Sequence, residues 1–550
     1  MRAWFLPLLI GLVAAVAVLV SPQPGITLDE PFNVWHGQML AQTVRQADWI
    51  GYEVACEQLP DHPPLGRLWL GLFQTDSGDP KNLQFPAARL APAQAFGLLV
   101  FLIGWMTTRW HGPLAGATAA VSVILLPRTF GHAHIASLET FVNLTYGGCI
   151  LFLADRWGTR SPAVKTAAIG GVLFGLALLT KIQAAFLPVS VGLWMLVLSL
   201  TRPAEPVQPG SPPQRFSQSR VVSRLLHAGG LFVLWGSVGS LVFLVGWPWL
   251  WDGFPSHLLE YFGHAQERAT LLTWYFGEAL QDRLVPWHAP WLFSLTTVPV
   301  GLLGLGFLGA AGTARSHNFP ALIRSRETLI ALAMLMPLVI FSLPGVPDYD
   351  SERLFSMIFA LSGVFIGIGC KSLSAWLIPR TGAIQAQLML WSVLACQGWG
   401  LITMAPCHLS YYNLLVGGLP GANTLGLPTT YWGDSLTEEF LQQAAEEIPP
   451  GSIVQVLPVM HHQQLPILAQ NPHFKRRQLK VAPYNTVKSP YVLWFSRKDY
   501  LPQEFRRLAD AIPLPPSASL PHPHPQTSLP DNLVELRRSG VLLAALTRVR

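Results

Sequence analysis

An acidic pair, Asp29-Glu30, follows the first apolar segment of the chain, residues 4–20, after a short Pro-rich stretch. Either carboxylate could simply open a helix, because acidic side chains favour the N-terminal end of a helix. If the apolar segments cross a membrane, the same pair lies at the mouth of a helix bundle, where a carboxylate can act as a general base on a substrate at the membrane surface. Both interpretations stay open, and Asp29 and Glu30 are candidate catalytic residues.

A second group of polar residues precedes another apolar segment, where His132 and His134 stand shortly before Glu139. Two histidines near a carboxylate can indicate zinc. A His-x-His pair, however, points to opposite flanks of a helix, and a third or fourth ligand is not evident, so we expect no metal. A carboxylate that enters an apolar segment is costly without a partner. Glu139 is therefore a candidate catalytic residue, and His132 a candidate substrate contact.

Two cations lie at the ends of apolar segments. Arg353 follows Tyr349, Asp350 and Glu352 directly in the chain, and Lys181 lies between two segments with no acidic neighbour. Arg353 either pairs with Asp350 or Glu352, or grips a phosphate with its forked guanidinium group. Two such cations on one side of a membrane suit a lipid phosphate. We therefore expect Lys181, Tyr349, Asp350 and Arg353 to bind the substrate.

Further polar residues occur in two long loops. His62 stands before Pro63-Pro64, a pair that marks a helix boundary as readily as a substrate contact. Residues 261–268 resemble an interfacial amphipathic helix, and residues 286–291 an aromatic belt. The remaining candidate contacts to an anionic head group are His62, His264, Arg268 and His288.

The composition is that of a membrane protein. Hydrophobic residues make up 51% of the chain and charged residues only 12%, against roughly 25% charged in soluble domains. A bilayer core needs about 20 apolar residues in a helix. We therefore predict a polytopic α-helical protein with about 11 transmembrane helices. These lie near residues 4–20, 91–108, 113–127, 139–154, 166–180, 183–200, 228–246, 291–311, 328–343, 353–370 and 386–404.

The basic residues predict the orientation. The net charge is +6, but Lys and Arg lie in short loops on one side of the predicted helices instead of on one face, so we expect no nucleic-acid partner. That side is cytoplasmic by the positive-inside rule. The loops 21–90 and 247–290 and the tail after residue 404 then face outward. Residues 1–20 could instead be a signal peptide, and in either case Asp29 stays outside.

The tail has a different character from the rest of the chain. Residues 436–447 follow a helical, amphipathic pattern, while 452–457, 491–495 and 541–546 are typical of short strands. Residues 513–530, rich in Pro, Ser and His, predict a loop. We therefore divide the chain into a transmembrane domain, residues 1–404, and a small extracytoplasmic α/β domain, residues 405–550.

Several of these motifs, taken in order, resemble the protein O-mannosyltransferases and their bacterial relatives. These are GT-C glycosyltransferases that use polyprenyl-phosphate sugars, and the lipid A aminoarabinose transferases share their fold. The resemblance covers roughly residues 1–440. It is carried by Asp29-Glu30, His62-Pro63-Pro64-Leu65-Gly66, Leu179-Thr180-Lys181, Pro286-Trp287-His288, Tyr349-Asp350-x-x-Arg353, His408-Leu409-Ser410-Tyr411-Tyr412-Asn413, Gly417-Gly418 and Thr430-Tyr431-Trp432-Gly433-Asp434.

The resemblance implies an inverting sugar transfer without a metal or cofactor. Asp29 matches the family's catalytic acidic residue and would deprotonate the acceptor hydroxyl, while Arg353, Lys181 and Arg268 would stabilise the departing polyprenyl phosphate. Glu139 stands near a second acidic position that often carries Asp, a departure that leaves its role open. Mannose is the family's default sugar, and the acceptor is a protein, lipid or glycan. The resemblance also implies a multi-pass protein of the inner (plasma) membrane, in contact with membrane lipid, whose active site faces the periplasm or exterior.

Two other classes remain as alternatives. A transporter or flippase for a lipid-linked or anionic solute predicts repeat symmetry and ionisable residues deep in the spans. The notable ionisable residues here cluster at one face instead, and no pair of related halves stands out. A membrane scaffold whose outer domain binds a partner would have no use for Asp29 or Arg353.

Overall fold

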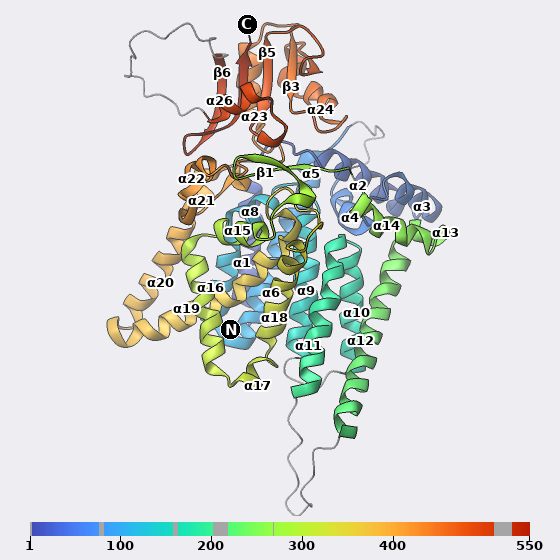
Figure 1. Ribbon diagram of the computed structural model, residues 1–550, viewed down its shortest axis with the longest axis vertical. Coiled ribbons are helices and arrows are strands. Elements are labelled where there is room, and N and C mark those ends of the chain that lie inside the picture. Colours follow the sequence, from blue (N-terminus) through green and yellow to red (C-terminus); the bar gives the residue numbers. More distant parts are fainter. Residues whose placement is uncertain are drawn as a thin grey trace, which may run out of the picture.

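The computed structural model describes residues 3–75, 82–157, 163–201, 218–267, 269–510 and 531–549. Long helices form a bundle, short helices cover one end of it, and a domain that contains a β-sheet lies beyond them (Figure 1). The predicted architecture, a helical bundle with a small C-terminal α/β domain, is confirmed. The candidate site lies where these three layers meet.

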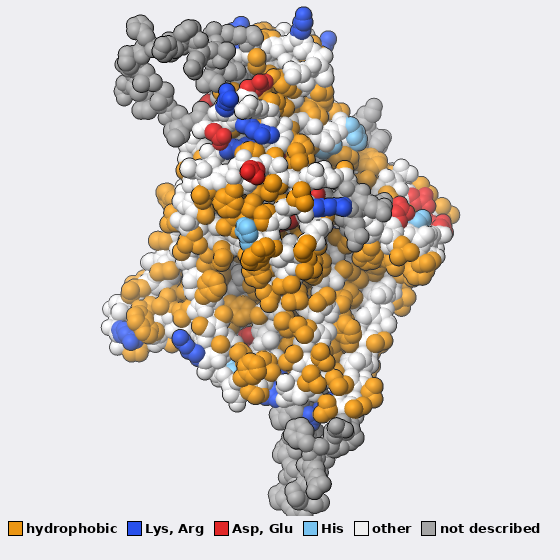
Figure 2. Space-filling view, in the orientation of Figure 1, with side chains coloured by type: hydrophobic (Ala, Val, Ile, Leu, Met, Phe, Trp, Pro, Cys, Tyr) orange, Lys and Arg blue, Asp and Glu red, His pale blue; other side chains and the backbone are white. Residues whose placement is uncertain are grey.

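The eleven predicted segments are largely helical. They correspond to α1 (Phe5–Val20), α6 (Leu90–His111), α7 (Pro113–Ile124), α9 (Glu139–Trp157), α10 (Val164–Leu178), α11 (Leu187–Thr201), α12 (Gln218–Gly246), α16 (Val300–Ser316), α18 (Arg326–Phe341), α19 (Met357–Thr381) and α20 (Ala383–Gln397). Within the described part of the chain, four helical stretches are each long and apolar enough to cross a membrane, namely Phe85–His111, Ile182–Thr201, Val221–Gly246 and Met357–Thr381. Hydrophobic side chains cover much of the visible surface of the bundle (Figure 2).

Three predicted spans contain a break or a turn that the prediction did not include. The segment predicted over 291–311 consists of α15 (Ala289–Thr296) and α16, which meet at a 108° bend. Prolines at 290 and 299 begin these two helices, since proline suits a helix start and not an interior. Arg353 lies in a 3-10 turn before α19, and the segment predicted over 386–404 divides into α20 and α21 (Trp399–Met404).

Glycines allow the bundle helices to approach closely. A Cβ atom added at Gly309 of α16 would lie 1.9 Å from the carbonyl oxygen of Phe365 in α19, and one at Gly369 would lie 1.9 Å from that of Leu305. The two backbones are therefore in contact, as small residues permit between membrane helices.

The basic ends of several helices gather at one end of the bundle. His111 at the end of α6 bonds Glu327 near the start of α18 at 3.0 Å, and Lys371 of α19 donates to the carbonyl of His111 at 2.9 Å. In Figure 1 the short helix α17 (Phe319–Leu322) lies at this end and the C-terminal sheet at the opposite one. The basic loops and the C-terminal domain are therefore on opposite sides of the bundle.

Short elements cover the end of the bundle nearer the C-terminal domain. They are α2 (Glu30–Arg45), α3 (Trp49–Gln58), α4 (Pro64–Leu72), α5 (Phe85–Ala88), α8 (Pro127–His132), α13 (Trp249–Asp252), α14 (Ser256–Glu267), β1 (Leu272–Tyr275), β2 (Glu278–Gln281) and α22 (Gly418–Thr424). Helices α2 and α4 pack backbone to backbone, because a Cβ atom at Gly71 would lie 1.8 Å from the carbonyl oxygen of Gly37.

The C-terminal domain contains a five-stranded mixed sheet in the order β4-β3-β5-β7-β6. Its elements are α23 (Glu438–Glu447), β3 (Ile453–Leu457), α24 (Gln464–Gln470), α25 (Pro472–Arg476), β4 (Lys480–Pro483), β5 (Tyr491–Phe495), α26 (Gln503–Asp510), β6 (Asp531–Arg538) and β7 (Val541–Arg548). The predicted helix and the three predicted strands are confirmed. The predicted loop 513–530 lies outside the described residues.

The two unpredicted strands, β4 and β6, form the edges of this sheet. Their side chains are mostly half-buried, so they lack the continuous apolar pattern of β5 and β7. The core of the domain also includes Leu28, Ile135 and Leu409, which come from the N-terminal loop and from the outer end of the bundle. The domain is therefore packed directly onto the elements that surround Asp29.

Candidate functional site

Arg353 is the centre of a buried ion network. Its side chain is 9% exposed, and each of its three bonding nitrogens contacts a different carboxylate. Nε donates to Glu139 at 2.9 Å, Nη1 to Asp350 at 2.7 Å and Nη2 to Asp29 at 2.5 Å. These carboxylates come from the first turn of α9, from the turn before Arg353 and from the start of α2. The structure thus brings together Asp29 and Arg353, which are 324 positions apart in the chain.

Asp29 is the most accessible of the three carboxylates. It occupies the N-cap position of α2, yet its side chain makes no capping hydrogen bond there and turns to Arg353 instead. Its side chain is 38% exposed, against 1% for Glu139 and 5% for Asp350. A molecule that arrives from outside therefore meets Asp29 before the other two acids.

Glu30, the other half of the acidic pair, holds the chain around Asp29. It is fully buried, and its two oxygens accept from Arg89 Nε and Nη2 at 2.8 Å each. The same oxygens accept from the backbone N–H groups of Thr27 and Ala136. Since these bonds occupy both oxygens, Glu30 fixes the start of α2 and leaves Asp29 as the member of the pair that faces the network.

The segment before Asp29 is also tied to the residues that lead into α23 of the C-terminal domain. The N–H of Gly25 donates to the carbonyl of Asp434 at 2.8 Å, and that of Leu28 donates to the carbonyl of Trp432 at 3.1 Å. Trp432 in turn lies under the guanidinium group, with 4.1 Å between Arg353 Cζ and the ring centroid. The surroundings of Asp29 therefore include both its own N-terminal loop and the segment that contains Trp432 and Asp434.

Lys181 is a second buried cation in the network. Its Nζ donates to the same oxygen of Glu139 that Arg353 uses, at 2.6 Å. Lys181 lies where α10 has ended and a 3-10 turn begins, so its side chain leaves the apolar helices and reaches the first residue of α9. One buried carboxylate oxygen thus orients both cations. Pairing of this kind is needed because an isolated buried charge is strongly destabilising.

A second ion pair lies beside this network. Arg128 pairs with Glu352, the acid that the sequence offered as a partner of Arg353. His132 Nε2 lies 3.9 Å from Glu352, and neither nitrogen of its ring makes a hydrogen bond. Burial lowers the pKa of His132 to about 4, so its ring is neutral at pH 7. Within the described ranges, no group of three His, Cys, Asp or Glu is arranged to hold a metal ion.

Two further predicted residues border the network. His62 stands just before α4, which begins at Pro64, and its buried Nδ1 has no hydrogen-bond partner. Burial lowers the pKa of His62 to about 4, with Lys181 and Asp29 among the charges that act on it. The ring of Tyr349 lies 5.9 Å from Arg353 Cζ. Both residues therefore belong to the surroundings of the cluster.

The remaining predicted contacts are not part of the described cluster. His288 is exposed at the start of α15, where its ring packs against Tyr275 and Trp287 at centroid distances of 5.8 and 5.6 Å. This arrangement fits the aromatic-belt interpretation of that segment. The side chain of His264 and the whole of Arg268 lie outside the described residues.

Three residues of the site were not predicted from the sequence, namely Arg128, Trp432 and Arg497. Arg128 shares the motif of His132, and Trp432 belongs to a motif that carried the family resemblance, so each had a signal. Arg497 had none. It lies in the C-terminal domain beyond the resemblance, yet its Nη2 is 3.2 Å from Asp350.

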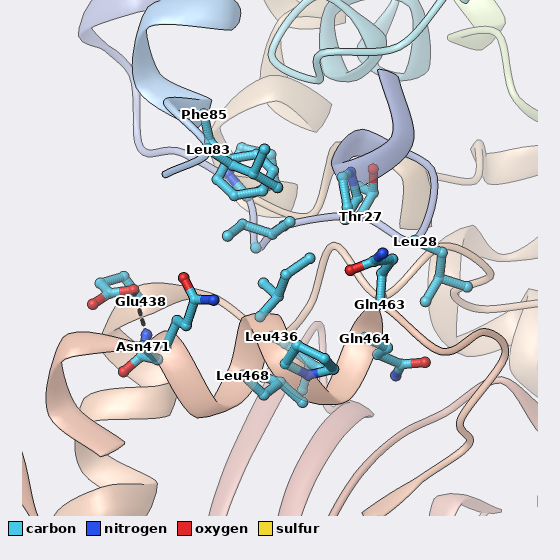
Figure 3. Close-up of a pocket in the computed structure, with 18 of the residues that line it drawn as sticks. Thr27, Leu28, Leu83, Phe85, Leu436, Glu438, Gln463, Gln464, Leu468 and Asn471 are labelled. Atoms are coloured by element: carbon cyan, nitrogen blue, oxygen red, sulfur yellow. Dashed lines mark hydrogen bonds between the residues drawn. The ribbon is translucent and has the colours of Figure 1, made fainter. Parts of the chain in front are cut away.

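A large cavity lies beside the start of α2, between the bundle and the C-terminal domain (Figure 3). Its volume is about 1570 Å³. Thr27, Leu28, Leu83 and Phe85 line one side, and Leu436, Gln463, Leu468 and other residues of the C-terminal domain line the other. The wall is mainly apolar, with amide side chains between the apolar ones. Leu28 lines the cavity and is followed in the chain by Asp29, which is not one of the lining residues.

No family model and no curated protein matches the chain. Among solved structures, the chain is similar to ArnT from Cupriavidus metallidurans bound to undecaprenyl phosphate, with 14% identity over 98% of this chain and 97% of that one and a TM-score of 0.48. It is also similar to the oligosaccharyltransferase AglB from Archaeoglobus fulgidus in complex with an inhibitory peptide and a dolichol-phosphate. That match has 10% identity over 89% of this chain and 69% of that one, and a TM-score of 0.44. These values are too low to support a function, which therefore depends on the contacts of the site.

Proposed function

We propose that this protein is an inverting glycosyltransferase of the GT-C type, which moves a sugar from a polyprenyl-phosphate donor to an acceptor hydroxyl. The observation that carries the proposal is the meeting of an accessible carboxylate, Asp29, with two buried cations, Arg353 and Lys181. A sugar transfer from a lipid phosphate needs both kinds of group. It needs a base for the acceptor and positive charge for the phosphate that leaves.

The donor phosphate binds at Arg353 and Lys181 in this proposal. All three bonding nitrogens of Arg353 already contact carboxylates, so an arriving phosphate has to displace one of them. The phosphate displaces Asp29, because the side chain of Asp29 is exposed whereas those of Glu139 and Asp350 are buried. Donor binding thereby frees the oxygens of Asp29 for the acceptor, so the base becomes available when the donor is in place.

The transfer then proceeds in one displacement. Asp29 takes the proton of the acceptor hydroxyl while the acceptor oxygen forms a bond to the anomeric carbon of the sugar. The bond between that carbon and the phosphate oxygen breaks, and its electron pair leaves with the polyprenyl phosphate. Arg353 and Lys181 accelerate this step to the extent that they hold the phosphate more strongly as its charge grows. Glu139, bonded to both cations, orients them.

The acceptor approaches through the cavity beside α2. Leu28, the residue before Asp29, lines that cavity, and its apolar wall with scattered amide groups suits a bulky acceptor, whether protein, lipid or glycan. We take mannose as the default sugar. From the positive-inside rule we expect this end of the bundle, with the C-terminal domain, on the periplasmic or outer side of the inner (plasma) membrane.

The test is transfer of labelled sugar from polyprenyl-phosphate donors in membranes that contain the protein, with mannose tried first. Asp29→Asn should lower the rate by about 100- to 10,000-fold, the usual range for a general base. Asp48→Asn is the matched control, since Asp48 caps α3 and lies in the same outer loop without contacting Arg353. Equal activity of Asp29→Asn and wild type would remove Asp29 as the base. Movement of a solute across vesicles without a new glycosidic bond would favour a transporter.

A further inference from the structure

The C-terminal domain places one cation next to the ion network. Arg497 lies two residues after the end of β5, and its side chain is 4% exposed. Nη2 contacts Asp350 Oδ1 at 3.2 Å, Nε contacts Asp499 at 3.2 Å, and Nη1 donates to the carbonyl of Tyr431. The guanidinium group is thus held on several sides and reaches out of its own domain to an acid of the candidate site.

Asp350 connects the two arginines with its two oxygens. Oδ1 faces Arg497, and Oδ2 accepts from Arg353 Nη1 at 2.7 Å. The backbone at this point is strained, because Asp350 and the following Ser351 have φ angles of +57° and +58°. Consecutive side-chain-bearing residues rarely adopt this left-handed region, and they persist there only when surrounding contacts hold them. The pair of ionic contacts to Asp350 is such a restraint.

We infer that Arg497 is a positioning residue of the proposed transferase, which fixes the Arg353 guanidinium group through Asp350. The inference rests on the proposed function of Arg353 as the phosphate-binding group. Arg497 does not contact Arg353 or Asp29 within hydrogen-bonding distance, so its effect passes through the carboxylate that it shares. A guanidinium group that shifts by even about 1 Å from its productive position can slow a reaction by about 100-fold.

The neighbouring residue provides a matched control. Lys498 is also a buried cation, 2% exposed, and its Nζ contacts Asp510 and Asn423 at 2.6 Å each. Asn423 lies in α22, so Lys498 likewise links the C-terminal domain to a segment outside its sheet. It makes no hydrogen bond or ion pair with Asp350. Removal of Lys498 therefore disturbs the anchoring of the domain and leaves the ion network intact.

The experiment compares the full-length variants Arg497→Met, Arg497→Lys and Lys498→Met in the sugar-transfer assay. We expect Arg497→Met to lower kcat by about 10- to 100-fold while KM for the donor changes by less than about threefold, because the loss falls on transition-state stabilisation. Arg497→Lys should recover part of the rate, since it keeps the charge next to Asp350. Lys498→Met should keep a kcat near that of wild type.

A second measurement does not depend on activity. Hydrogen exchange of the backbone amides in residues 348–356 should be faster in Arg497→Met than in wild type and unchanged in Lys498→Met, because only the first loosens the Asp350 turn. If wild type transfers no sugar but the exchange pattern holds, the proposed function fails and the positioning role of Arg497 stands. If Arg497→Met matches wild type in kcat and in exchange, or if both Met variants change equally, the positioning role is overturned.

Discussion

Glu139→Gln is the substitution whose energetic effect the structure defines most fully. One buried oxygen of Glu139 accepts from Lys181 at 2.6 Å and from Arg353 at 2.9 Å. Glutamine keeps the size of the side chain and one acceptor oxygen but removes the charge. Arg353 retains Asp29 and Asp350, whereas Lys181 loses the carboxylate that it contacts. The decrease in the free energy of unfolding should therefore come mainly from the charge of Lys181, which no longer has a carboxylate partner.

The magnitude follows from that contact distance. Two unit charges 2.6 Å apart attract by about 6 kcal/mol at an effective dielectric constant of about 20. The net loss is smaller, because pairing only offsets the desolvation of both groups. Removal of one partner from a buried pair typically costs about 3–5 kcal/mol. We expect that decrease in the free energy of unfolding for Glu139→Gln. In Glu139→Gln/Lys181→Met most of it should be recovered, since no uncompensated charge remains.

Unfolding of the purified protein in detergent by denaturant measures these differences. Glu447→Gln serves as a control, because Glu447 is exposed at the end of α23 and a substitution of such a surface acid usually changes stability by less than about 0.5 kcal/mol. A double variant as unstable as Glu139→Gln alone would refute the reasoning, since the loss would then not arise from the charge left on Lys181.

Two further substitutions test the packing and the electrostatics around the site. Burial raises the pKa of Asp434 to about 6 from its ordinary value of 3.8. Between these pH values the folded chain holds a proton that the unfolded chain has released. The free energy of unfolding should therefore fall by about 3 kcal/mol as pH rises from about 4 to 6. Asp434→Asn should remove this loss and unfold at higher denaturant concentration than wild type above pH 6; an unchanged pH dependence would contradict the assignment. Gly71→Ala should cost about 1–3 kcal/mol, because its Cβ would meet the carbonyl of Gly37 at 1.8 Å. Gly263→Ala is the control, because a Cβ atom at Gly263 would meet nothing within 4 Å, and it should be neutral or stabilising. If the two glycine variants had equal melting temperatures, α2 and α4 would not pack as described.

The helices were predictable because their signal is local. A run of apolar residues has to become helical in a bilayer, and each of the eleven predicted segments did. Breaks inside such runs were harder to predict. The bend between α15 and α16 depends on Pro299, but proline also occurs inside α18 at Pro337, so the residue type alone does not separate a break from a tolerated proline.

The site was predictable in part for a related reason. Asp29, Glu139, Lys181 and Arg353 are charged residues at the ends of apolar segments, where a partner is required, so their chemistry singled them out. The pairing of Arg353 with its neighbour Asp350 was among the predicted alternatives, but its pairing with Asp29 and Glu139 was not, since these acids come from distant parts of the chain. Glu30 is acidic like its neighbour Asp29, and the sequence does not show which of the two side chains faces Arg353.

The hydrogen bonds that join residues 25 and 28 to residues 434 and 432 have a consequence for biosynthesis. A chain made from its N-terminus contains Asp29 hundreds of residues before residues 432 and 434 exist. With the proposed function, nascent protein should therefore lack activity until these residues have been made. Premature termination before residue 432 would leave the loop around Asp29 without these partners, and cellular proteases would recognise the chain there.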